Sequence, residues 1–257
     1  MHAWLTRVGE RGQAVQRPRN AGKAERFGAI IDQRRAPEET RALYALDGAD
    51  GITPLFAGTA LDALAAHDPW VGWLAVDSPA LEKAESLCRE RGLGWMWLPP
   101  GGAMAPSLEL LQRLSVLDDA GGGQSLVQLQ RPEAWSALLA VASSSQFDHW
   151  LHILGAVYTP TPTGGWHCWT GSEPHVAECA AMLDSEQCQA LDDAPLAWWL
   201  GRELGIPLED VPAQRLEQLR RLREAGIRQP REWRRRLPDS ASADIPRSAH
   251  VVTSKEA

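Results

Sequence analysis

Residues 42–76 constrain the fold most, because they combine two apolar runs with tight turns. The first run, residues 42–46, is apolar on both faces, which predicts a strand that is covered on both sides. Gly48 and Gly51 then predict sharp turns, because glycine supplies the positive φ that such turns need. Residues 70–76 predict a second strand. The segment therefore resembles scaffold rather than a reactive site.

A short helix is expected between these two strands, over residues 60–66. Thr59 precedes it as a capping residue, and Asp62 occupies the third helical position, as in a capping box. Pro69 ends it, because a residue before proline avoids the α region. No nucleophile, acid pair or phosphate-binding loop is apparent in the segment.

The runs LYALDGA and PLFAGTALDALAAHDPWV resemble the amino-terminal lobe of the bacterial type VI secretion effector adaptors, also called effector chaperones. The resemblance continues weakly to about Arg236. That family usually carries a helix between the two motifs, whereas residues 50–54 alone fill the space here. The resemblance implies a cytoplasmic, non-catalytic protein without a cofactor. Its implied partners are one secreted toxic effector and the VgrG spike protein.

Composition indicates a globular protein in a reducing compartment. The four cysteines among 257 residues are too few and too scattered for a disulfide framework. The first residues lack the apolar stretch of a signal peptide, and no apolar run approaches the roughly 20 residues that cross a bilayer. A net charge of −7 argues against general nucleic-acid binding. Twelve tryptophans predict a tryptophan-rich core with some exposed binding anchors.

The order of the segments predicts an α+β fold with two lobes. Residues 1–38 are expected to be a loose leader, with a possible strand at residues 27–31. Residues 39–170 are expected to form a mixed α/β lobe in which Leu43 and Leu46 are buried. Strand patterns then disappear, so residues 171–237 predict a smaller, all-helical lobe. Residues 238–257 are rich in Ser, Ala and Asp, which predicts a disordered tail.

Several elements have clear boundary residues. Ser78 predicts the cap of a helix that Gly92 ends. Residues 93–98 predict a strand, and residues 115–117 and 125–130 predict a hairpin. Residues 166–169 predict a further strand. Other helices are expected over residues 107–114, 132–142, 146–154, 185–191, 195–204, 212–225 and 230–237.

A zinc site is the first chemical possibility. Histidine and cysteine gather between residues 167 and 188 as His167, Cys168, His175, Cys179 and Cys188. Structural zinc sites prefer closely spaced ligand pairs, and only His175 and Cys179 approach that spacing. The sequence therefore favours buried thiols and solvent-facing histidines over a metal.

Catalysis has weak support from the sequence. His149 and His152 would share a helix face and suit metal binding or proton transfer, but no third ligand is identifiable, so the sequence favours a plain helix surface. No nucleophile-elbow or phosphate-loop motif is present. We therefore expect no catalytic and no metal-binding residues. The alternative is an enzyme of unknown class that uses His149 and His152 or the region from His167 to Cys188.

The arginine-rich segment, residues 215–236, is the strongest candidate for partner binding. Nine arginines against three glutamates give it a charge of +6, so the rest of the chain carries −13. Arg215 and Arg223 fall within the apolar stripe of a predicted helix. Either their stems cover the core, or they meet acidic groups of another lobe or a partner. The candidate partner-binding residues are Arg215, Arg223, Arg234, Arg235 and Arg236. Nucleic-acid binding by this segment is a weaker possibility.

Overall fold

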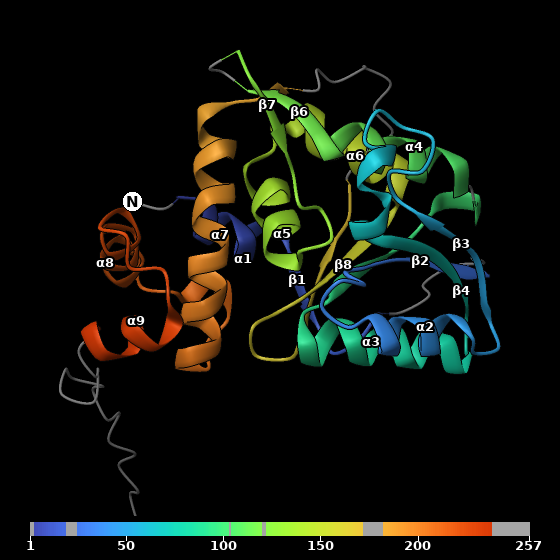
Figure 1. Ribbon diagram of the computed structural model, residues 1–257, viewed down its shortest axis with the longest axis horizontal. Helices are drawn as coiled ribbons and strands as arrows, with labels where there is room; N and C mark the ends of the chain where they lie inside the picture. Colours follow the sequence, from blue (N-terminus) through green and yellow to red (C-terminus); the bar gives the residue numbers. More distant parts are fainter. Residues whose placement is uncertain (1–2, 19–24, 103, 120–121, 172–181, 238–257) are drawn as a thin grey trace, which may run out of the picture. The chain divides into compact units, whose positions relative to one another are not determined.

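The chain has an α+β fold built around a seven-stranded antiparallel sheet with helices on both faces (Figure 1). The computed structural model describes residues 3–18, 25–102, 104–119, 122–171 and 182–237. It divides into two compact units, Met1–Leu216 and Glu217–Ala257. The predicted fold class is confirmed.

The large sheet has the strand order β1-β9-β8-β5-β2-β4-β3, and every neighbouring pair is antiparallel. Its strands are β1 (Gln13–Val15), β2 (Arg26–Ile31), β3 (Ala49–Pro54), β4 (Trp70–Ala75), β5 (Gly94–Leu98), β8 (Ala156–Pro160) and β9 (Trp166–Trp169). The central strands β2, β4 and β5 are buried along most of their length, because helices cover both faces. The strands predicted near residues 27–31, 70–76, 93–98 and 166–169 are confirmed.

Helices α2 (Pro37–Tyr44) and α3 (Pro79–Arg91) cover one face of the sheet (Figure 1). Phe27, Ala29 and Ile31 of β2 point into this layer and join the buried faces of both helices in one apolar cluster. The predicted caps of α3 are confirmed. The Ser78 hydroxyl accepts a hydrogen bond from the amide of Leu81, and Gly92 ends the helix in the left-handed conformation.

Tryptophans form the core on the opposite face, beneath α5 (Pro132–Val141) and α6 (Ser144–Leu154). Trp95 and Trp135 stack with ring centroids 5.0 Å apart and an interplanar angle of 9°. Trp97 and Trp150 extend the row from its two ends, at centroid distances of 5.3 and 5.7 Å. The Trp95 indole also donates to the carbonyl of Leu129, which lies in the loop that precedes α5. Ring packing therefore joins the large sheet to two helices.

The prediction that residues 42–46 form a strand is wrong. Residues up to Tyr44 belong to α2, which begins with a proline at its first position and has two glutamates in its first turn. Leu43 is fully buried, as expected, but Leu46 lies in the following turn and is 37% exposed. A short apolar run fits a buried helix face as well as a strand. The short helix expected at residues 60–66 is instead a 3₁₀ segment, η1 (Asp62–His67).

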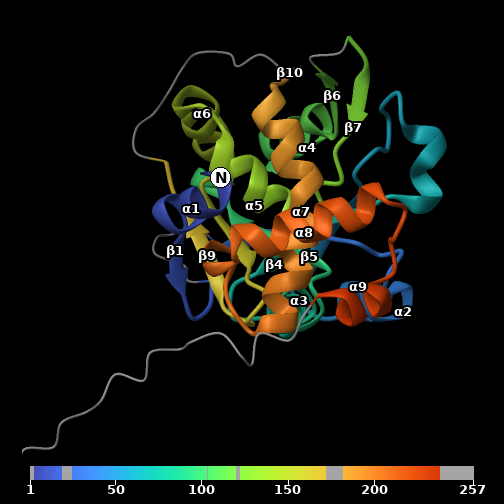
Figure 2. The same ribbon diagram turned by 90° about the vertical axis from the view of Figure 1, so that its left-hand side faces the viewer.

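The amino-terminal residues are not a loose leader. Trp4, Leu5 and Val8 are the buried face of α1 (Ala3–Arg11), which lies beside α5 and the edge strand β1 (Figure 2). β1 pairs with β9, and β2 is a central strand of the large sheet. The contacts of α1 with α5 and of β1 with β9 join residues more than 100 positions apart, so local sequence patterns cannot predict them.

Arg11 ties α1 to the carboxyl end of α5. Its Nη1 donates to the carbonyls of Leu139 (3.1 Å) and Ala142 (2.7 Å), and its guanidinium lies 5.1 Å from the Phe147 ring centroid. We expect Arg11→Ala to lower the free energy of unfolding by about 1.5–3 kcal/mol, because the carbonyls of Leu139 and Ala142 would lose their charged hydrogen-bond donor. The exposed ion pair of Arg7 makes Arg7→Ala the matched control, with an expected loss of about 0–1 kcal/mol. Equal losses in urea unfolding would contradict this role.

A second, three-stranded sheet has the order β10-β6-β7, with strands β6 (Val116–Asp119), β7 (Gln124–Leu126) and β10 (Met182–Leu183). It follows α4 (Met104–Ser115), and the short η2 (Pro100–Gly102) precedes that helix. β6 and β7 form the expected hairpin. β10 then pairs in parallel with β6, so the second sheet joins segments from two distant parts of the chain.

The first compact unit extends past the predicted lobe boundary at residue 170. It includes α7 (Ser185–Leu204), which packs on α5, and η3 (Leu208–Asp210), which contacts α1. Two helices were predicted here because proline usually interrupts a helix, but α7 continues through Pro195. The buried alanines before and after Pro195 lie on one continuous face. The expected tail, residues 238–257, lies outside the described residues.

The second unit begins within α8 (Ala213–Glu224) and contains α9 (Pro230–Arg236). Both helices were predicted, within one or two residues at each end. The Trp233 indole donates to the carbonyl of Ile227 and fixes α9 against the preceding loop. Among the described helices of both units, none has the length and apolar character that crossing a membrane requires.

Candidate partner-binding site

β7 lies at an edge of the second sheet, because β6 is its strand neighbour among the described residues. The amide of Val127 donates to the carbonyl of Ser115 across the hairpin, at 2.9 Å. Bonding groups alternate in direction along an antiparallel strand, so the amide and carbonyl of Leu126 face away from β6. The Leu126 side chain is 50% exposed. This strand, with the residues up to Gln128, is called the β7 edge here.

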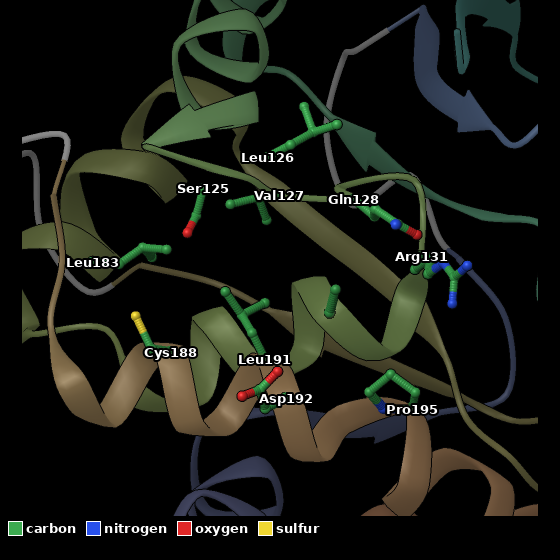
Figure 3. Close-up of a pocket in the computed structure, with 11 residues that line it drawn as sticks. Ser125, Leu126, Val127, Gln128, Arg131, Leu183, Cys188, Leu191, Asp192 and Pro195 are labelled. Carbon is green, nitrogen blue, oxygen red and sulfur yellow. The ribbon is translucent and has the colours of Figure 1, made fainter. Parts of the chain in front are cut away.

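The first hollow lies between the β7 edge and α7 and has a volume of about 350 Å³ (Figure 3). Its lining comes from the β7 edge, β10, the start of α5 and one face of α7. Ser125 and Val127 point toward the helix, whereas Leu126 points the opposite way. The lining residues are Ser125, Leu126, Val127, Gln128, Arg131, Ala134, Leu183, Cys188, Leu191, Asp192 and Pro195.

The second hollow lies beside the same stretch of backbone and has a volume of about 240 Å³. Leu126 and Leu64 both line it, and they are two of the exposed large apolar side chains, at 50% and 41%. The full lining is Arg34, Phe56, Leu64, Pro69, Leu126, Val127, Gln128 and Gln130. The β7 edge therefore separates two hollows.

Hydrogen bonds hold the far wall of the second hollow. The Asp68 carboxylate accepts from the amide of Phe56 at 2.9 Å, which ties the two ends of this wall together. The Gln112 side chain donates to the carbonyls of Leu55 (2.9 Å) and Ala57 (3.4 Å). Burial raises the pKa of Asp68, and the hydrogen bond from Phe56, which by itself lowers that pKa, offsets only part of the effect. The side chains of Asp68 and Gln112 therefore hold the backbone of this wall through bonds that do not involve β7.

Arg131 stands at the start of α5 and lines the first hollow. Its Nε is buried without a hydrogen-bond partner among the described residues, and its Nη1 is 4.0 Å from the Glu133 carboxylate. The side chain remains 39% exposed. The exposed part of the guanidinium can therefore donate to an incoming carboxylate.

Burial raises the pKa of Glu133 above its ordinary value of 4.5, although Arg131 and Arg35 act in the opposite direction. A raised carboxyl pKa means that the folded state binds the proton more tightly than the unfolded state, so stability falls as the pH rises from 4.5 through the folded pKa. Glu133→Gln should therefore raise the free energy of unfolding at pH 7. The difference from the unchanged protein should disappear as the pH falls below 4.5. Urea unfolding at pH 7 and pH 4 measures both quantities.

Glu109→Gln provides the control for this prediction, because Glu109 is exposed on α4. It should bring no comparable gain at pH 7. A loss of stability in Glu133→Gln at pH 7 would mean that attraction to Arg131 outweighs burial, contrary to this account.

The predicted arginines are divided between the two units. Arg215 belongs to the first unit, and Arg223 and the three arginines of α9 belong to the second. Arg215 and Arg223 are half-buried, whereas Arg234, Arg235 and Arg236 are exposed. Their role in partner binding stays a prediction.

Glu217 forms ion pairs with two of the arginines of α8. It accepts from Arg220 and from Arg221, each at 3.2 Å. The pair with Arg220 is of the i,i+3 type and the pair with Arg221 of the i,i+4 type, and both are spacings that bring side chains together on a helix surface. Such exposed pairs contribute only tenths of a kcal/mol, so they leave the arginines available for exchange of partners.

The candidate metal ligands do not form a cluster in the part of the chain that the structure describes. No group of three His, Cys, Asp or Glu side chains there has the arrangement of a metal site. His149 and His152 lie on α6, His167 and Cys168 on β9, and Cys188 on α7. His175 and Cys179 lie outside the described residues.

His167 is instead part of a buried contact. It is 1% exposed, its Nε2 lies 3.3 Å from a carboxylate oxygen of Glu209, and its ring meets Trp169 edge-on. Burial alone would raise the pKa of Glu209, but the bond from His167 and the backbone bond lower it below its ordinary value. This pair joins η3 to β9 of the large sheet, so its role in the structure is to hold these two elements together.

The expectation of exposed tryptophan anchors is wrong. Nine of the 12 tryptophans are buried, namely Trp4, Trp73, Trp95, Trp97, Trp135, Trp150, Trp166, Trp169 and Trp233. Trp70, Trp198 and Trp199 are half-buried. The exposed apolar side chains next to a hollow are leucines instead. The alternation around Leu126 predicted a hairpin, but neither its exposure nor the two hollows is visible in the sequence.

Comparison of the chain with protein-family models, with curated proteins and with solved structures found no match.

Proposed function

We propose that this chain is a non-catalytic adaptor of the cytoplasm that binds a type VI secretion effector and helps to load it onto the VgrG spike. The partner classes come from the LYALDGA and PLFAGTALDALAAHDPWV motifs, which lie in α2, β3, η1, the start of β4 and the turns between them. The observation that carries a protein-binding role is the β7 edge, where an exposed leucine stands between two hollows. Exposed apolar side chains beside hollows are typical of protein recognition.

The enzyme alternative has less support. It would use either His149 and His152 or the region from His167 to Cys188. His167 is buried and bound to Glu209, so its ring is not placed to meet a substrate. His149 and His152 lie on α6, whereas the hollow lined by Cys188 contains neither of them. A catalytic group must reach the atom that reacts, and these positions do not converge.

Co-expression with the proteins encoded beside this chain tests the proposal. A tagged copy should retain one effector, and a VgrG protein should join that complex during size-exclusion chromatography. Deleting the gene should abolish delivery of that effector and leave delivery of other effectors intact. Loss of all secretion, or normal delivery of every effector, would contradict an adaptor role.

Two arginine variants test whether the second unit contributes to the same complex. Arg223→Ala should weaken binding more than Arg235→Ala, because Arg223 is half-buried and Arg235 is exposed. Removal of one partner from a desolvated charge pair costs roughly 2–5 kcal/mol, whereas an exposed charge mainly changes the association rate. Melting temperatures provide the folding control. A lower melting temperature of Arg223→Ala with unchanged affinity would make this residue structural.

A further inference from the structure

Within the part of the chain that the structure describes, Leu126 of the β7 edge has backbone groups that do not pair with β6, at a hollowed surface. Leu126 presents its amide and carbonyl away from β6, as the alternation of the ladder requires. An added strand would lie about 4.8 Å from β7, in register with these groups. Sheet edges commonly bind extended segments of other chains in this way.

The side chains of an added strand would also find space. Ser125 and Val127 point toward the first hollow, and Leu126 points the opposite way (Figure 3). Successive side chains of a strand alternate between two faces. Neighbouring residues of an added strand would therefore enter the first and the second hollow in turn. At about 350 and 240 Å³, the hollows have room for side chains of the size of valine, leucine or phenylalanine.

Charge favours an acidic occupant. Arg131 lines the first hollow with a buried Nε that has no partner among the described residues, and Arg34 lines the second. Asp192 is the acidic residue of the two linings. A second copy of this chain, paired edge to edge, would bring the arginines of both copies to one surface. Like charges at short range oppose that arrangement.

We propose that the β7 edge binds an extended segment of a partner protein as an added strand, with alternating apolar side chains in the two hollows and a carboxylate at Arg131. This inference rests on the proposed function only in that the natural partner is the effector. Backbone pairing supplies the affinity in such a complex, and the hollows with Arg131 supply the choice of sequence.

Synthetic peptides test the site without a known partner. The probes are fluorescent nonapeptides, acetylated and amidated, in which valine or leucine alternates with threonine and one threonine is replaced by glutamate. Fluorescence polarisation with the purified full chain should show binding at micromolar to millimolar concentration. Gln in place of Glu should weaken binding about tenfold or more, and Arg131→Gln should remove that difference. Methylation of alternate backbone amides should abolish binding.

Leu126→Pro and Leu126→Ala separate the backbone from the side chain. Proline removes only an amide that faces away from β6, and edge strands accept proline there, so the fold should persist. Leu126→Pro should weaken peptide binding by roughly 3- to 10-fold relative to Leu126→Ala, because alanine keeps the amide. Circular dichroism and the melting temperature check the folding of both variants. A third variant, Arg131→Gln, tests the site where a proline variant unfolds.

Each outcome decides the proposal. Equal affinities of the folded Leu126→Pro and Leu126→Ala proteins, or no binding of any probe, would overturn strand addition. A dimer that sedimentation shows to dissociate in Leu126→Pro would make a second copy the occupant, which also overturns it. Equal affinity of the purified effector for the folded Leu126→Pro and Leu126→Ala proteins would leave the adaptor function intact and reject this site. Peptide binding without any co-purified effector would reject the adaptor function and leave this site intact.

Discussion

Replacement of Trp135 by alanine should lower the free energy of unfolding by about 3–5 kcal/mol, which is a large part of the stability of a domain. Trp135 is fully buried and stacks on Trp95 at 5.0 Å and on Trp150 at 5.7 Å. Its removal would open a cavity between the sheet and α6, because neighbouring rings of this size cannot all move to fill it. Urea unfolding followed by circular dichroism measures the loss.

Trp198→Ala is the matched control for this substitution. Trp198 belongs to α7 and is half-buried, so the same truncation removes less buried surface. Its expected loss is less than half of that for Trp135→Ala. Comparable losses in the two variants would show that the row of stacked rings is not the centre of the core.

The elements with local boundary residues could be predicted from the sequence. Ser78 and Gly92 mark the two ends of α3 through hydrogen bonds and backbone conformation that depend on nearby residues alone. The hairpin of β6 and β7 could be predicted for the same reason, since a short glycine-rich turn joins its strands. Interactions among residues close in sequence determine these features, so the sequence alone is enough to predict them.

The elements that depend on distant partners could not be predicted. β1 is a strand because Gln13–Val15 pairs with β9, more than 150 residues away. Residues of α2 near Leu43 are apolar on adjacent positions, a pattern that fits a strand as well as a buried helix face, and α2 packs on α3, which is far from it in the sequence. The same limit applies to the boundary predicted at residue 170, because the contact of α7 with α5 lies beyond any local pattern.

The candidate site shows the limit most clearly. The charge of the arginine-rich segment is visible in the sequence, yet the exposure of each arginine is not. Leu126 is one leucine among many until the sheet order places its strand at an edge. Tryptophan content suggested binding anchors, but the described structure uses most of these rings as core. Exposure is a property of the assembled fold, so the site could be found only after the fold was known.

Gly94→Ala should be the most disruptive single change in the large sheet. Gly94 of β5 faces Ile31 of β2, and a Cβ at this position would lie 1.9 Å from the carbonyl oxygen of Ile30. The added Cβ is fixed to the backbone of β5, and the oxygen it would meet is part of the backbone of β2. No side-chain rotation can therefore relieve the overlap. The pair would have to separate, and its hydrogen bonds would be lost.

We expect Gly94→Ala to lower the free energy of unfolding by about 4 kcal/mol or more, or to leave the protein insoluble. Urea unfolding of the soluble fraction and its yield measure the effect. Gly165→Ala is the matched control, because a Cβ there would meet only the Thr161 hydroxyl, at 3.3 Å. That variant should stay within about 1 kcal/mol of the unchanged protein. Gly94→Ala protein with a near-normal urea midpoint would mean that β2 and β5 do not pair in this register.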